Sequence, residues 1–127
     1  EAGAQFLVSP GTTDALLRYA VECSVPFLPG VATISEIMRV RDLGCRVAKL
    51  SPADGSRRIS FLRSVAGPLP DMKFCPTGGI DATLAPSYLQ LPNVIAIGGS
   101  WMARGELAAA ERLSEIRALA KDAAAIR

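Results

Sequence analysis

Five short apolar runs recur along the chain, and the longer stretches between them carry apolar residues at helical spacing. The runs are rich in Val, Ile and Phe, and most of them stop at Pro or Gly, a pattern typical of strands rather than helices. The five expected strands are residues 5–9, 25–28, 46–50, 72–75 and 94–98. Strands and helices are therefore expected to alternate along the sequence.

Helix starts follow four of the five expected strands. Thr33 and Glu36 have the spacing of a capping box, so we interpret Glu36 as a helix cap. Thr12 or Thr13 can cap the first helix and Asp81 the fourth. The Ala-rich stretch 106–127 predicts the longest helix. The apolar faces expected on the four earlier helices are Leu16, Leu17, Ala20 and Val21; Ile34, Ile37, Met38 and Val40; Ile59, Leu62 and Val65; and Leu84, Tyr88, Leu89 and Leu91.

Alternating strands and helices predict an α/β fold with parallel strands joined by right-handed crossovers. An open doubly wound sheet and a (β/α)8 TIM barrel both have this pattern. The sequence contains no GxGxxG or GxxxxGK[ST] loop, which disfavours the common open-sheet nucleotide binders. A barrel needs eight units, and the chain opens on EAGAQF as the middle of a domain would. We therefore expect residues 1–127 to form an incomplete barrel domain, strands 4–8, without its N-terminal units.

Charge and composition exclude several functional classes. The 127 residues include 14 basic and 12 acidic ones, a net charge of +2, so neither a nucleic acid nor a membrane is expected as a partner. Histidine is absent, which excludes Ser-His-Asp and Cys-His catalysis and histidine metal sites, and we expect no metal. Three cysteines without a CxxC motif indicate reduced, buried thiols in a cytoplasmic protein. No apolar run approaches the roughly 20 residues of a membrane span.

Two consecutive expected strands end in Gly-Gly beside a hydroxyl residue, in FCPTGGID (74–81) and IGGSWM (97–102). Glycines let a backbone approach a ligand closely, and exposed N–H groups bind anions. Barrel enzymes frequently bind phosphate with the loops after their last two strands. Each loop alone is explained by a tight turn, but the pair in register predicts a phosphate site. Its expected residues are Thr77, Gly78, Gly79, Gly98, Gly99 and Ser100.

Lys49 stands at the end of the apolar run VAKL, directly before the turn SPADG. On local grounds a lysine there extends to water along its apolar stem. The alternative is a reactive amine, because apolar neighbours disfavour the charged form and a free amine attacks ketones to form a Schiff base. The expected phosphate site at the same ends of later strands favours the reactive interpretation.

The blocks FLVSPGTT, PFLPGVATISEIM, KLSPAD, FCPTGGID and IGGSWM together resemble the 2-keto-3-deoxy-6-phosphogluconate (KDPG) and 4-hydroxy-2-oxoglutarate (KHG) aldolases. The resemblance runs almost from end to end. It implies a (β/α)8-barrel class I aldolase, commonly homotrimeric, that needs no metal or organic cofactor. Such enzymes cleave KDPG to pyruvate and glyceraldehyde 3-phosphate in the Entner–Doudoroff pathway. By the same resemblance Lys49 matches the Schiff-base lysine, and the two glycine loops match the loops after strands seven and eight.

The chain departs from the family pattern in two ways. Ser51 stands where the family usually has a large apolar residue, which loosens the apolar wall beside Lys49. The family's acid/base glutamate and carboxylate-binding arginine lie on early strands, and no residue here matches them. One alternative is therefore an inactive fragment that only binds phosphate or associates with other chains. A second is another phosphate-binding barrel enzyme, similar to thiamin-phosphate synthase or indole-glycerol-phosphate synthase, against which the lysine block argues.

Overall fold

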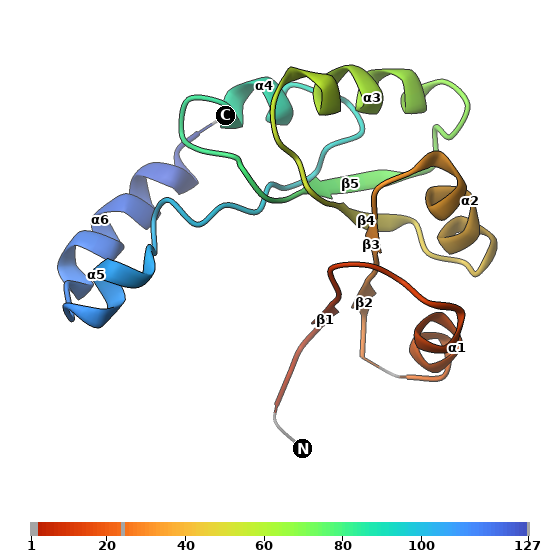
Figure 1. Cartoon of the computed structure of the whole chain (residues 1–127), viewed down its shortest axis with the longest axis horizontal. Helices are drawn as coiled ribbons and strands as arrows, with labels where there is room; N and C mark the ends of the chain where they lie inside the picture. Colours follow the sequence, from red (N-terminus) through yellow and green to blue (C-terminus); the bar gives the residue numbers. More distant parts are fainter. Residues whose placement is uncertain (1–2, 24, 127) are drawn as a thin grey trace.

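The computed structural model describes residues 3–23 and 25–126 and has an α/β fold in which every strand pair is parallel. The chain order is β1 (Leu7–Val8), α1 (Asp14–Glu22), β2 (Phe27–Leu28), β3 (Gly30–Val31), α2 (Ile34–Asp42), β4 (Val47–Leu50), α3 (Ser56–Ala66), β5 (Lys73–Pro76), α4 (Ala85–Leu89), α5 (Gly105–Ala109) and α6 (Leu113–Ala124). Figure 1 shows α4, α3, α2 and α1 following one another in an arc around the strands. The predicted α/β class with parallel strands is confirmed.

Strand neighbours follow the order of the chain. β1 pairs with β2, and β3, β4 and β5 form a second sheet in that order. The strand expected at residues 25–28 is observed as β2, whereas β3 lies beyond its predicted end. Pro29 separates β2 from β3 because it has no N–H to donate to a ladder. Its carbonyl still accepts a hydrogen bond from the N–H of Lys49, at 2.8 Å. The register pairs Gly30 with Lys49 and Lys49 with Cys75.

The expected strand 94–98 is not a continuous strand in the structure. Its residues pair with the preceding segment at two isolated points, Val94 with Phe74 and Gly98 with Thr77. This segment lies next to β5 at the edge of the sheet. Within the described residues, it therefore has a hydrogen-bonded neighbour on one side only. The segment lies beside β5 as predicted, but the prediction that it forms a continuous strand is wrong.

The core lies between the strands and helices α1–α4. All three predicted core residues of α3, namely Ile59, Leu62 and Val65, are buried. The faces predicted for α1 and α2 are buried only in part, because Val21 and Met38 remain 61% and 51% exposed. The buried stripe on each helix is therefore narrower than predicted, with Leu17 on α1 and Ile37 and Val40 on α2.

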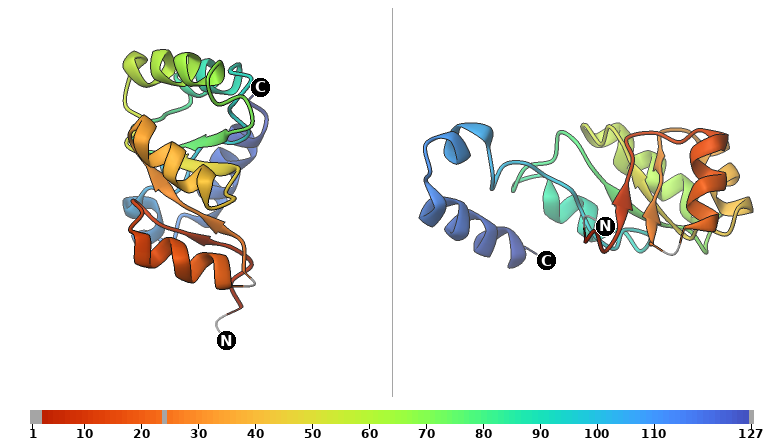
Figure 2. Two further views of the ribbon diagram at one scale, coloured as in Figure 1. Left: turned by 90° about the vertical axis from the view of Figure 1, so that its right-hand side faces the viewer. Right: turned by 90° about the horizontal axis from the view of Figure 1, so that it is seen from below.

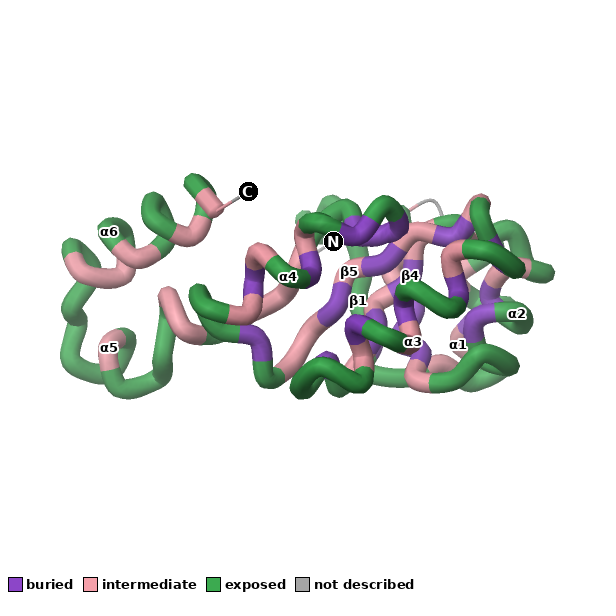
Figure 3. Tube along the Cα trace, turned by 90° about the horizontal axis from the view of Figure 1, so that it is seen from above, coloured by how far each residue is buried: buried purple, intermediate pink, exposed green. Residues whose placement is uncertain are grey.

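The prediction of one long helix over 106–127 is wrong. Glu111 adopts a positive φ of 53°, and the chain reverses between α5 and α6 so that the two helices pack against each other. Figures 1 and 2 show this pair projecting from one end of the molecule. Both helices lie in the described part of the chain, and neither contains a buried residue (Figure 3).

Candidate active site

Lys49 lies on the face of β4 that points away from the helices. Along this strand Ala48 and Leu50 are fully buried, while Val47 and Lys49 are partly exposed, as the period of two in a strand requires. Lys49 is therefore neither a core residue nor a freely exposed one. It stands one residue from the carboxyl end of β4.

Cys75 is the direct neighbour of Lys49 across the β4–β5 ladder and shares its face of the sheet. Burial raises the pKa of the Cys75 thiol, while a hydrogen bond with Thr77 and the positive charge of Lys49 oppose that rise. The thiol is thus held in its protonated form beside the amine. The sequence predicted only a buried thiol here, because strand register cannot be read from spacing alone.

Backbone hydrogen bonds join the loop after β4 to the loop after β5. The N–H of Ala53 donates to the carbonyls of Thr77 and Gly78, at 3.1 and 3.2 Å. The hydroxyl of Tyr88, from α4, donates to the carbonyl of Ala53 at 2.9 Å. These bonds fix the segment that follows Lys49 relative to the first glycine loop.

The two glycine loops enclose a pocket of about 290 Å³, whose lining residues are Thr77, Gly78, Gly79, Gly98, Gly99 and Ser100. These are the six residues that the sequence predicted to lie together. Gly78 and Gly79 have φ angles of 98° and 72°, a region that residues with a side chain rarely adopt. The lining contributes the hydroxyl residues Thr77 and Ser100 and four glycines, whose backbone a bound anion can approach closely.

Gly98 lets the second loop approach the first. Its N–H donates to the carbonyl of Pro76 at 2.8 Å, and a Cβ added to it would lie 2.6 Å from the Thr77 hydroxyl oxygen. Only a residue without a side chain fits there unless Thr77 moves. Trp101 packs its ring over Gly99 and against the core, and so anchors this loop.

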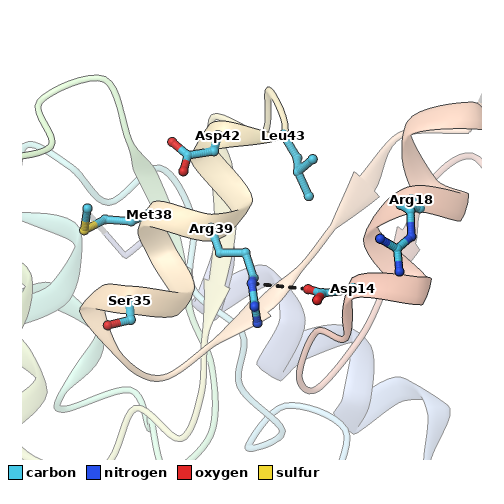
Figure 4. A pocket seen from close by; sticks show the side chains of 7 residues that line it. All are labelled: Asp14, Arg18, Ser35, Met38, Arg39, Asp42 and Leu43. Atoms are coloured by element: carbon cyan, nitrogen blue, oxygen red, sulfur yellow. Dashed lines mark ion pairs between the residues drawn. The ribbon is translucent and has the colours of Figure 1, made fainter.

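A larger hollow, of about 450 Å³, lies in the outer helical layer between α1 and α2. Figure 4 shows Arg39 of α2 reaching across it to Asp14 of α1, with which it forms an ion pair of 3.2 Å. Both side chains are more than half exposed. None of the residues predicted for the site lines this hollow.

Glu36 is a helix cap, as predicted. Its carboxylate accepts hydrogen bonds from the N–H groups of Ala32 and Thr33, at 2.7 and 2.9 Å, and Thr33 completes the capping box. The Ala32 hydrogen bond is the main cause that lowers the pKa of Glu36. Over the described ranges, no cluster of three metal-ligating side chains occurs and no helix is long and apolar enough to cross a membrane.

Comparisons with known proteins agree on one family. The family model of the KDPG and KHG aldolases matches residues 1–119. The 2-dehydro-3-deoxy-phosphogluconate aldolase of Pseudomonas aeruginosa is 48% identical over 120 residues, which are 90% of this chain and 54% of that protein. The KHG/KDPG aldolase of Escherichia coli is 42% identical over 123 residues, 97% of this chain and 58% of that protein.

Solved structures give the same result. The KDPG aldolase of Legionella pneumophila, captured with pyruvate as a covalent carbinolamine intermediate, is 41% identical and superposes with a TM-score of 0.90. The superposition covers 93% of this chain and 57% of that one. The chain thus spans a little over half the length of the relatives it matches. It belongs to the family of KDPG and KHG aldolases, which are lyases.

Proposed function

We propose that Lys49 forms a Schiff base with the keto group of a phosphorylated 2-keto-3-deoxy sugar acid whose phosphate binds in the glycine pocket. The proposed reaction is the cleavage of KDPG to pyruvate and glyceraldehyde 3-phosphate, and we include 4-hydroxy-2-oxoglutarate as a further substrate. The observation that carries this proposal is the position of Lys49 and of the pocket at the same ends of neighbouring parallel strands.

We further propose that the chain forms the C-terminal five β-α units of a (β/α)8 barrel. Supporting this, strand neighbours follow chain order, as in a barrel, whereas doubly wound sheets reverse their order at a switch point. The helices cover one face of the strands, and Lys49 stands on the other. The complete protein is proposed to be a homotrimer, with no cofactor and with neither a nucleic acid nor a membrane as partner.

The proposed mechanism uses the amine of Lys49 as nucleophile. Its nitrogen attacks C2 of the substrate, water leaves, and the resulting iminium withdraws the electron pair of the C3–C4 bond as that bond breaks. The C4 hydroxyl loses its proton and becomes the aldehyde oxygen. The enamine left on Lys49 is protonated at C3, and hydrolysis of the imine releases pyruvate and the free amine. We assign the proton transfers to no carboxylate of this chain, since Glu36 is occupied as a cap.

A second candidate is that these 127 residues alone bind phosphate or associate with other chains without catalysing cleavage. The observation behind it is the exposure of large apolar side chains at both ends of the strand order. Phe6 and Val8 are 62% and 47% exposed beside or on β1, and Ile95 is 57% exposed in the outermost segment. Such apolar positions on sheet edges favour pairing with another chain.

Borohydride reduction in the presence of pyruvate tests the proposal. The reagent reduces the imine to a stable secondary amine, and peptide mass spectrometry locates the label. We expect the label on Lys49, and none on that peptide in Lys49→Ala. Lys73 is a matched control, because it shares the sheet face on β5 but donates to the Pro92 carbonyl at 3.0 Å. A label on Lys73, or none on Lys49, would overturn the proposal, while trapping without cleavage would favour the second candidate.

A further inference from the structure

Four polar side chains lie in two rows on the open face of the β4–β5 pair. Lys49 pairs with Cys75, and two residues further on Ser51 and Thr77 extend the same two segments. The ladder continues to this point, because the N–H of Thr77 donates to the carbonyl of Leu50 and that of Ser51 to the carbonyl of Val31. Alternate residues on a strand share a face. The row Lys49–Ser51 therefore leads from the reactive amine towards the glycine pocket.

The side chain of Ser51 lies beside Gly78, one of the residues that line that pocket. A Cβ added to Gly78 would lie 3.9 Å from the Ser51 hydroxyl oxygen, in ordinary contact. Ser51 is half-buried. Gly78 lines the pocket, and Lys49 precedes Ser51 by two residues on the same face. The hydroxyl thus lies between the two points at which the proposed substrate is held.

A substrate held at both ends presents its middle carbons to Ser51. With C2 bonded to Lys49 and the phosphate on C6 in the glycine pocket, C4 and C5 lie between them. The C4 hydroxyl is consumed when the C3–C4 bond breaks. The C5 hydroxyl takes no part in the bond changes, and it is the group nearest the phosphate end, where Ser51 meets Gly78.

We propose that the Ser51 hydroxyl binds the C5 hydroxyl of KDPG and so makes this site prefer KDPG to substrates without that hydroxyl, 4-hydroxy-2-oxoglutarate among them. This inference rests on the proposed function. A site built to hydrogen-bond a substrate hydroxyl rejects the analogue that lacks it, because a half-buried polar group is then left without its partner. Serine suits this role since its hydroxyl both donates and accepts.

The experiment compares two substrates in the complete protein and in two variants. The substrates are KDPG and its 5-deoxy analogue, and pyruvate release is measured with lactate dehydrogenase. We expect wild type to prefer KDPG about tenfold in kcat/KM. In Ser51→Ala this preference is expected to fall to near unity, mainly through loss of activity on KDPG. Ser51→Thr, which keeps the hydroxyl, is expected to retain the preference.

The ratio of two kcat/KM values in one preparation does not depend on the fraction of folded enzyme, so a purely structural effect leaves it unchanged. An unchanged ratio in Ser51→Ala, with pyruvate still trapped on Lys49, overturns the role of Ser51 and leaves the proposed function standing. Absence of trapping on Lys49 in wild type overturns both. Loss of the preference in Ser51→Thr as well as in Ser51→Ala also contradicts the hydrogen bond, because the threonine hydroxyl is preserved.

Discussion

The hydroxyl of Tyr88 connects α4 to the loop that follows the reactive lysine, and its removal should have a measurable cost. It donates to the carbonyl of Ala53 at 2.9 Å, and the carbonyl of Gly55 lies further away at 3.3 Å. The single hydroxyl proton is counted once, in the shorter bond. Tyr88→Phe removes the oxygen and keeps the ring, so no cavity of side-chain size forms.

The expected loss follows from burial. Tyr88 and Ala53 are both 0% exposed, so the Ala53 carbonyl loses its partner where water does not reach it. A lost hydrogen bond of this kind costs about 1–2 kcal/mol of unfolding free energy. In urea this corresponds to a midpoint lower by about 0.5–1 M with an unchanged slope. Limited proteolysis of the 51–55 loop should also become faster.

Tyr19→Phe is the matched control, because Tyr19 is 64% exposed on α1. Its unfolding free energy should stay within about 0.5 kcal/mol of wild type. If Tyr88→Phe changes the free energy no more than this control does, the bond to Ala53 does not stabilise the loop and the reasoning fails. A change in the urea slope would indicate a different native or unfolded state instead of a lost bond.

Alkaline pH gives an independent check on the same residue. Burial, reinforced by the nearby charge of Asp54, raises the pKa of Tyr88 above its ordinary value of 10.0, against an opposing effect of Arg58. A raised pKa means that the native state keeps the proton when the unfolded chain has lost it. The stabilisation by the protonated Tyr88 hydroxyl is therefore complete below about pH 10, and it is lost as the pH rises through the native pKa of Tyr88. The difference between wild type and Tyr88→Phe should shrink in that range.

Two further predictions concern the pocket and the outer surface. Gly98→Ala should raise KM for KDPG about tenfold or more, because the new Cβ meets the Thr77 hydroxyl at 2.6 Å, while pyruvate trapping on Lys49 should persist. Gly67→Ala is the control and should leave KM unchanged, because there is open space around the Gly67 Cα. Asp71→Asn should be less stable than wild type at neutral pH in urea unfolding. The difference should begin to shrink below about pH 4 and vanish as the pH falls through the lowered native pKa. The reason is that a hydrogen bond from Arg41 lowers the pKa of Asp71. The ionised carboxylate therefore stabilises the native state above the unfolded-state pKa, and this stabilisation is lost on acidification. A stability difference between Asp71→Asn and wild type that persists in acid would contradict this explanation.

The helices that carry local signals were predictable from the sequence. The capping box of Thr33 and Glu36 marks the start of α2, and the spacing of Ile59, Leu62 and Val65 marks the buried face of α3. Both depend on residues three or four positions apart, whose relation is fixed by the helix itself. The six residues of the glycine pocket were also predictable, because the carboxyl ends of adjacent parallel strands meet at one edge.

Features set by distant contacts were not predictable. No Gly or Pro marks the reversal at Glu111, so the Ala-rich stretch read as one helix. The proximity of Cys75 to Lys49 depends on the register between strands, which their spacing in the sequence does not determine. The lysine block favoured this family over other phosphate-binding barrel enzymes, and the family match confirms that choice.

The strand order also has a consequence for folding. Each observed strand pairing joins consecutive strands with one helix between them, as when β4 pairs with β5 across α3. Loop-closure entropy grows only slowly with loop length, and contacts between near neighbours in sequence favour rapid folding. The pairing that aligns Lys49 with the first glycine loop closes a single helix-length loop. Its entropic cost is therefore independent of how much chain precedes β4 or follows β5.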